Sequence, residues 1–164
     1  MANTTFQGPV TSKAGFITTG PANVVDADSS VSLTVATHSG KIVHNDAAGA
    51  VTYTLPATNA NSDSAVAGPG ADLNNLSNVG AKFEIFASTT KTGNLVVQVA
   101  NATDVMIGSA SFIDDTSDNM VGFETAATSD TITLNGTDTG GVTFAKIECT
   151  VIASGKWKVD VISG

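Results

Sequence analysis

Two histidines and one cysteine are the side chains of this sequence best suited to nucleophilic or metal chemistry. A hydrolytic relay needs a serine or cysteine, a histidine and a carboxylate held together. The alternation of apolar and polar residues places His44 on the same strand face as Ile42, whereas His38 precedes Ser39-Gly40 in a turn. The two rings are therefore expected to point in different directions. Because the sequence also has no Gly-x-Ser-x-Gly elbow, it predicts no catalytic residue.

Cys149 is the single cysteine, and it lies on the apolar face of an alternating segment. A lone cysteine cannot form an intrachain disulfide, and a buried thiol behaves as a small, inert apolar group. No histidine and cysteine stand at the spacing of a zinc site. We therefore expect Cys149 to be structural.

An acidic cluster at Asp114, Asp115 and Asp118 offers hard oxygen ligands of the kind that Ca²⁺ requires. The cluster lacks the glycine and the final glutamate of an EF-hand loop. A solvated acidic turn is the alternative, and it is the interpretation that the sequence favours. The sequence thus predicts no metal and no cofactor, with calcium at these three aspartates as the competing hypothesis.

The balance of charge excludes several classes of partner. The net charge is -8, and all seven basic residues are lysines. Recognition of nucleic acid depends on clustered positive charge and on the guanidinium fork of arginine, and binding to anionic membranes also depends on positive charge. One tryptophan and one tyrosine make a poor platform for a sugar. We expect a protein that is not an enzyme, binds other proteins, and binds neither nucleic acid nor membrane.

Short alternating segments separated by turn residues must position these groups, and they predict an all-β fold. A single-domain β-sandwich or barrel, jelly-roll-like, is expected, while the order of the strands stays open. The last two predicted strands form a hairpin around Ala153-Ser154-Gly155. Strong alternation marks residues 31–35, 51–55, 83–87, 95–99, 147–151 and 157–161, and weaker alternation marks 41–45, 105–107, 111–113 and 131–134.

The 164 residues suit one domain preceded by an extended N-terminal arm. The domain is expected at residues 31–164, with a long loop at about 58–80, and the arm at residues 1–30. Large apolar side chains in the arm, which belong to no strand pattern, would be exposed unless they packed on a neighbour. They are therefore candidate docking residues: Phe6, Val10, Phe16 and Ile17.

Several stretches of the sequence resemble the head decoration (capsid cement) proteins of tailed bacteriophages. The resemblance lies in residues 1–16, 40–43, 52–56, 80–86 and 104–108. It implies a structural virion protein that binds the major capsid protein on the capsid exterior, forms a homotrimer and bridges neighbouring capsomers. On this view Phe6, Val10, Phe16 and Ile17 dock onto the capsid or a neighbouring subunit.

A head-fibre or tail-fibre domain that recognises a host-surface glycan is the alternative function. It would use the loop at residues 59–78 or the acidic turn at residues 114–118. The N-terminus has no basic region followed by an apolar segment, so synthesis in the host cytoplasm is expected under either hypothesis.

Overall fold

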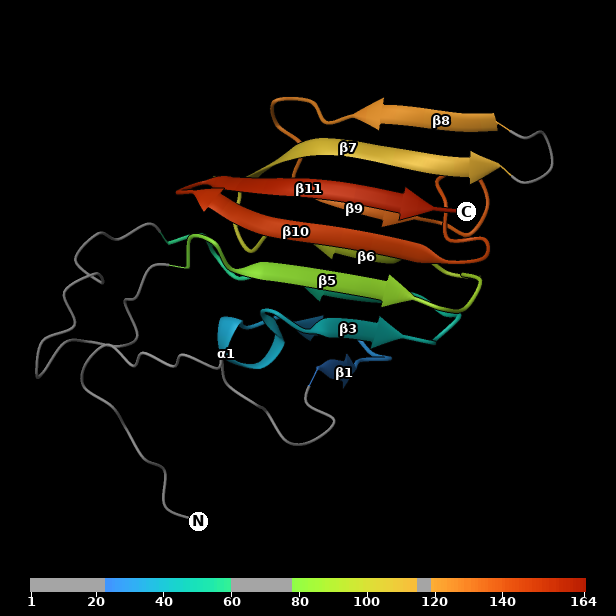
Figure 1. Cartoon of the computed structure of the whole chain (residues 1–164), viewed down its shortest axis with the longest axis horizontal. Coiled ribbons are helices and arrows are strands. Elements are labelled where there is room, and N and C mark those ends of the chain that lie inside the picture. Colours follow the sequence, from blue (N-terminus) through green and yellow to red (C-terminus); the bar gives the residue numbers. More distant parts are fainter. Residues whose placement is uncertain (1–22, 60–77, 115–118) are drawn as a thin grey trace, which may run out of the picture.

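The computed structural model describes residues 23–59, 78–114 and 119–164, which fold into two β-sheets packed around one core (Figure 1). The predicted all-β fold is confirmed. The large sheet has seven strands, in the order β1 (Val24–Asp26), β3 (Ile42–Asn45), β5 (Lys82–Ala87), β10 (Ala145–Ala153), β11 (Lys156–Ser163), β7 (Val105–Asp114) and β8 (Asn119–Glu124). The small sheet has four, in the order β2 (Val31–Ser32), β4 (Val51–Thr54), β6 (Leu95–Gln98) and β9 (Thr131–Leu134).

The first six strands alternate between the two sheets. β1, β3 and β5 are parallel neighbours in the large sheet, and β2, β4 and β6 are parallel neighbours in the small sheet. The chain therefore winds in successive coils, each of which adds one strand to each sheet. This strand order, which the sequence left open, differs from the antiparallel order of a jelly roll.

The other strands complete both sheets. β10 and β11 form an antiparallel hairpin between β5 and β7, and Gly155 adopts the positive φ of its turn. The hairpin predicted around Ala153-Ser154-Gly155 is confirmed. β9 pairs antiparallel with β6, while β8 pairs antiparallel with β7 and forms one edge of the large sheet.

Side chains from both sheets interlock to form the core. Phe83 and Trp157 make an edge-to-face aromatic contact, with ring centroids 5.8 Å apart. Cys149 is fully buried in this layer, so its predicted position on the apolar face is confirmed. The largest fully buried side chains are Trp157, Tyr53, Phe83, Leu33, Leu55, Ile85, Leu95, Met106, Leu134, Ile147, Val43 and Val97.

The strand predicted at residues 31–35 ends early. After β2 the chain forms a single turn of helix, α1 (Val35–His38), because the Thr34 side chain caps the turn by accepting a hydrogen bond from the Thr37 N–H. His38 closes the turn, since its Nδ1 accepts from the Thr34 N–H at 3.0 Å. No helix in the part of the chain that the structure describes is long and apolar enough to cross a membrane.

The two strands predicted at residues 105–107 and 111–113 are one continuous strand, β7. Gly108, which separates the two predicted strands in the sequence, lies within β7. A Cβ atom built at Gly108 would stand 1.7 Å from the carbonyl oxygen of Val159 in β11, so glycine permits a close approach of the two backbones.

The domain begins before the predicted boundary at residue 30. β1 lies within the predicted arm, yet it pairs with β3 and belongs to the large sheet. Within the predicted loop at 58–80, the described ends are joined: the Asn59 N–H donates to the Asn78 side chain at 2.7 Å. Thr58 is held by the carboxylate of Asp104, which precedes β7.

Candidate functional site

The edge strand β8 exposes large apolar side chains on both of its faces. Val121 and Phe123 lie on the same face of the sheet as Phe112 of β7. Met120 lies on the opposite face, beside Ile113 of β7. Met120 is 71% exposed and Phe123 is 52% exposed, although such side chains normally lie inside a protein. We call Phe112, Ile113, Met120, Val121 and Phe123 the β8 edge surface.

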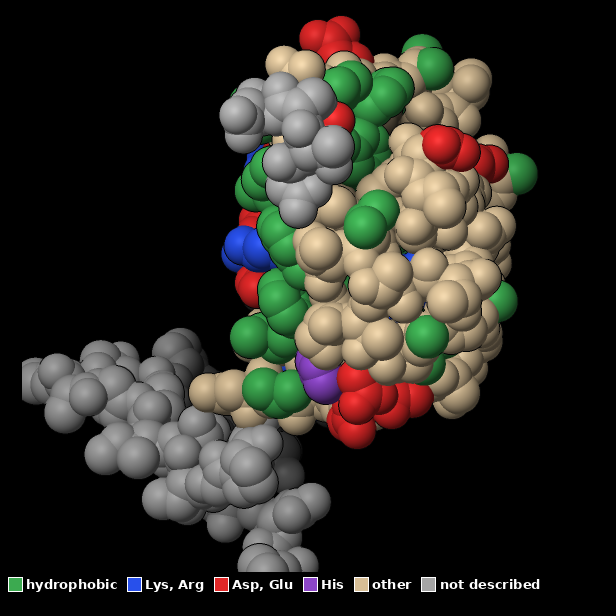
Figure 2. Space-filling view, turned by 90° about the vertical axis from the view of Figure 1, so that its right-hand side faces the viewer, with side chains coloured by type: hydrophobic (Ala, Val, Ile, Leu, Met, Phe, Trp, Pro, Cys, Tyr) green, Lys and Arg blue, Asp and Glu red, His purple; other side chains and the backbone are tan. Residues whose placement is uncertain are grey.

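The β8 edge surface borders two hollows. An open groove of about 510 Å³ lies along Phe112, Val121 and Phe123 and reaches the loop between β9 and β10. A smaller hollow of about 240 Å³ lies between the β7–β8 pair and β9. Figure 2 shows hydrophobic side chains gathered in the upper part of the molecule, where β7 and β8 lie. The seven-stranded sheet thus leaves apolar side chains uncovered beside β8, beyond the edge of the four-stranded sheet.

The composition of β8 is unusual for a sheet edge. Edge strands commonly carry lysine, proline or bulges that prevent pairing with another chain. β8 has the sequence NMVGFE, so Glu124 is its only charged residue. All six residues of β8 are exposed. An exposed apolar edge of this kind is typical of a surface that another protein covers.

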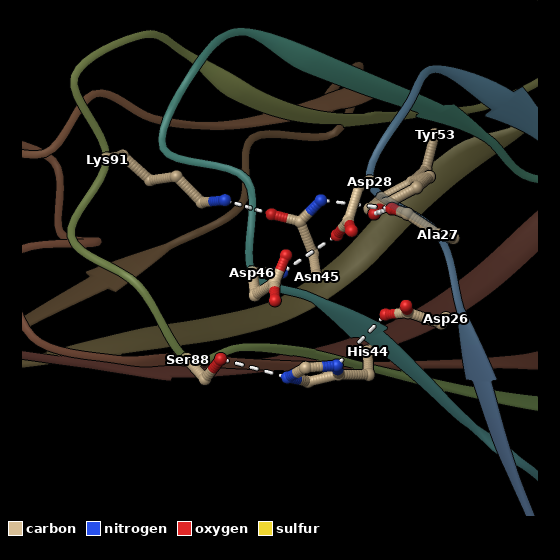
Figure 3. Close-up of polar contacts among 9 residues, drawn as sticks. All are labelled: Asp26, Ala27, Asp28, His44, Asn45, Asp46, Tyr53, Ser88 and Lys91. Carbon is tan, nitrogen blue, oxygen red and sulfur yellow. Dashed lines mark hydrogen bonds and ion pairs between the residues drawn. The ribbon is translucent and has the colours of Figure 1, made fainter.

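A second cluster, of polar side chains, lies at the opposite edge of the large sheet (Figure 3). Asp26 of β1 and His44 of β3 are register partners, and Ser88 follows β5. The Nδ1 atom of His44 lies 3.1 Å from Asp26 Oδ1, and its Nε2 atom lies 2.9 Å from Ser88 Oγ. Carboxylate, imidazole and hydroxyl thus stand in the order of a hydrolytic relay.

The surroundings of this row do not resemble a hydrolase site. In such enzymes, backbone N–H groups stabilise the oxyanion, and the N–H of the nucleophile can be one of them. The Ser88 N–H instead donates to the Asn45 carbonyl oxygen at 3.0 Å. The Asp26 side chain is 69% exposed, so water screens its charge. The row is best described as surface hydrogen bonding across three neighbouring coils.

Two further carboxyl groups lie beside this row. The Asp46 N–H donates to Asp28 Oδ1 at 3.0 Å. A hydrogen bond from the Asp46 backbone lowers the pKa of Asp28, whereas the side-chain hydrogen bond with Asp28 raises the pKa of Asp46. Within residues 23–59, 78–114 and 119–164, no three histidine, cysteine or acidic side chains are grouped so that they could hold a metal ion.

The structure describes some of the site residues predicted from the sequence and not others. The predicted docking residues Phe6, Val10, Phe16 and Ile17 lie outside the described residues, and so do Asp115 and Asp118 of the calcium hypothesis. Asp114 ends β7 as the register partner of Asn119. The prediction that Ile42 and His44 share a strand face is confirmed. They alternate in β3 with Val43 and Asn45, which are buried on the other face.

Sequence reasoning missed both clusters. Met120, Val121 and Phe123 give no clean alternation, since β8 has no buried face. The sequence signal that could have revealed this surface is a set of large apolar residues within a polar stretch. The contact of His44 with Asp26 and Ser88 depends on the parallel register of three strands, which the sequence did not predict. No protein-family model, curated protein or solved structure matches this chain.

Proposed function

We propose that this protein is a structural protein of a tailed-phage virion, which binds the outside of the capsid as a homotrimer and stabilises it by bridging neighbouring capsomers. The observation that carries the protein-binding part is the β8 edge surface, which leaves Val121, Phe123 and Met120 open to solvent. The phage capsid as the place of action rests on the resemblance of the sequence to decoration proteins. The major capsid protein is accordingly the proposed partner.

The physical argument concerns the contact between subunits. A stable interface of standard size covers about 800 Å² on each partner, and its centre is apolar and aromatic. The β8 edge surface offers an aromatic pair, Phe112 and Phe123, with ring centroids 5.3 Å apart. In the proposed trimer this surface packs against the adjacent subunit. Three linked subunits then engage several capsid sites at once, so modest single contacts suffice.

The test compares Phe123→Ser with the control Ile152→Ser, a substitution of a similarly exposed apolar residue in β10. Sedimentation of the full chain should show a trimer for the parent protein and for the control, and dissociation to monomers for Phe123→Ser. Co-sedimentation with undecorated capsids should weaken in parallel. A parent protein that is monomeric and leaves capsids bare would contradict the proposal. Specific binding on a glycan array would favour the fibre hypothesis instead.

The hydrogen-bonded row at His44 gives a separate check. Because the Ser88 N–H is used within the sheet, the proposal expects no hydrolysis that depends on Ser88. Hydrolysis of 4-nitrophenyl acetate should proceed at the same rate with the parent protein and with Ser88→Ala. A rate that drops with Ser88→Ala would show that the protein is an esterase.

A further inference from the structure

Lys91 is a lysine buried within the fold. Its side chain belongs to the loop between β5 and β6, and the residue is only 2% exposed. Its Nζ donates one hydrogen bond to the side-chain oxygen of Asn45 (Figure 3) and another to the carbonyl oxygen of Ala47. Among the residues that the structure describes, no carboxylate lies within ion-pair distance of Nζ. The amine is thus enclosed by neutral oxygen atoms.

Asn45 holds its side-chain amide in a fixed orientation against this amine. The residue ends β3 and is 0% exposed. Its Nδ2 donates to the Ala27 carbonyl oxygen at 3.0 Å, and its Oδ1 accepts from Lys91. The amide carbon is one bond, about 1.2 Å, from that oxygen, so the amine lies next to the carbon. A nucleophile and an electrophile fixed side by side gain greatly in effective concentration.

Two carboxyl groups, Asp28 and Asp46, act on the charge of Lys91. Burial lowers the pKa of Lys91, while the charges of Asp28 and Asp46 act in the opposite direction. A lower pKa favours the neutral amine of Lys91, which is the nucleophilic form. The Asp46 backbone N–H and the hydrogen bond that the two side chains share lower the pKa of Asp28, and the shared hydrogen bond raises the pKa of Asp46. Of the two, Asp46 takes up a proton more readily, and Asp28 stays ionised more readily.

We propose that Lys91 and Asn45 join in an intramolecular isopeptide bond. The lone pair of the neutral Nζ attacks Cγ of Asn45, and the Nζ–Cγ bond forms. The Cγ–Nδ2 bond then breaks, and its electron pair leaves on Nδ2. The proton released from Nζ reaches Nδ2 by way of water and the Asp28–Asp46 pair, and ammonia departs. One amide replaces another, so the step needs no oxidant, reductant or cofactor.

The bond would connect the end of β3 to the loop after β5, across two neighbouring coils. The two residues are 46 positions apart, so the link closes a long covalent ring. Cross-links over long segments stabilise a fold chiefly by restricting the unfolded chain. In a chain with a single cysteine, an amide can provide a cross-link that a disulfide cannot. This inference does not depend on the proposed function.

Mass spectrometry of the denatured full chain tests the proposal directly. The expected mass is lower than the sequence mass by one molecule of ammonia. After trypsin, cleavage behind Lys91 should be lost, and residues 83–146 should be recovered attached to residues 42–82. A full sequence mass, or a free Lys91 side chain in a linear peptide, would overturn the proposal. Loss of ammonia without the branched peptide would also overturn it, because asparagine can lose ammonia alone.

Variants identify the two partners. Lys91→Arg keeps the positive charge and Asn45→Ala removes the amide, so each should have its full sequence mass. Lys82→Arg is the matched control, because Lys82 is a surface lysine paired with Glu148, and it should keep the loss of ammonia. Loss of ammonia that persists in Lys91→Arg would contradict the proposal. If a variant fails to fold, the mass of the parent protein still decides.

Discussion

Burial makes the Cys149 thiol and the Tyr53 hydroxyl group harder to deprotonate. It raises the pKa of Cys149 from 9.0 to about 12 and that of Tyr53 from 10.0 to about 12. In the unfolded chain both groups lose their protons at lower pH. Between the unfolded and folded pKa values, the unfolded state therefore binds fewer protons than the folded state. Stability must fall as the pH rises through this range.

The protein is accordingly expected to lose stability in alkaline solution. Above the unfolded pKa, each group lowers the free energy of unfolding by up to ~1.4 kcal/mol for every pH unit. Urea unfolding at a series of pH values between about 8 and 11 measures this slope. Tyr53→Phe and Cys149→Ala should each flatten it. A slope that stays the same in both variants would show that other groups cause the loss.

The residue scale also shows what the sequence could and could not predict. The burial of Cys149 followed from its alternation, and the face of His44 followed from its neighbour Ile42. The partners of His44 did not, because Asp26 and Ser88 reach it only through the parallel pairing of three strands. The burial of Lys91 was equally hidden, since its amine is held by side-chain and loop oxygens distant in sequence.

At the scale of elements, β7 depends on one glycine. A side chain at Gly108 would collide with the backbone of Val159 in β11, whereas a Cβ at Gly122 in β8 would meet nothing within 4 Å. Gly108→Ala should therefore lower the free energy of unfolding by ~1–3 kcal/mol, because the strands must separate. Gly122→Ala is the matched control and should leave stability unchanged or slightly raised.

Urea unfolding of the two glycine variants checks this prediction. Equal stabilities for Gly108→Ala and the parent protein would mean that β7 and β11 can move apart without loss.

Strands with one buried face were the most predictable from the sequence, and β8, which has no buried face, was missed. In β10 and β11, buried residues alternate with half-buried or exposed residues over most of each strand, so their sequences identified them. β8 is exposed throughout and gave no such pattern. The turn at α1 replaced a predicted strand because capping by Thr34 and His38 outweighed the alternation of residues 31–35. The periodicity of apolar residues cannot predict local hydrogen bonds of this kind.

The whole molecule is proposed to act together with copies of itself. Deleting residues 2–17 removes Phe6, Val10, Phe16 and Ile17 but stops short of β1, which begins at Val24. The shortened protein should still melt as a folded domain, because all its strands remain. It should lose capsid binding or trimer formation, because its apolar docking groups are gone. Capsid occupancy and sedimentation measure the outcome. If neither differs from the parent protein, the arm has no docking role.

The position of the β10–β11 hairpin has a consequence for biosynthesis. It lies between β5 and β7, so among the strands that the structure describes, the two halves of the large sheet pair only through residues 145–163. A ribosome makes β1, β3, β5, β7 and β8 first, and these strands cannot close into one sheet until β11 has been synthesised. Chains cut short by premature termination would therefore expose unpaired strand edges and be degraded or aggregate instead of folding.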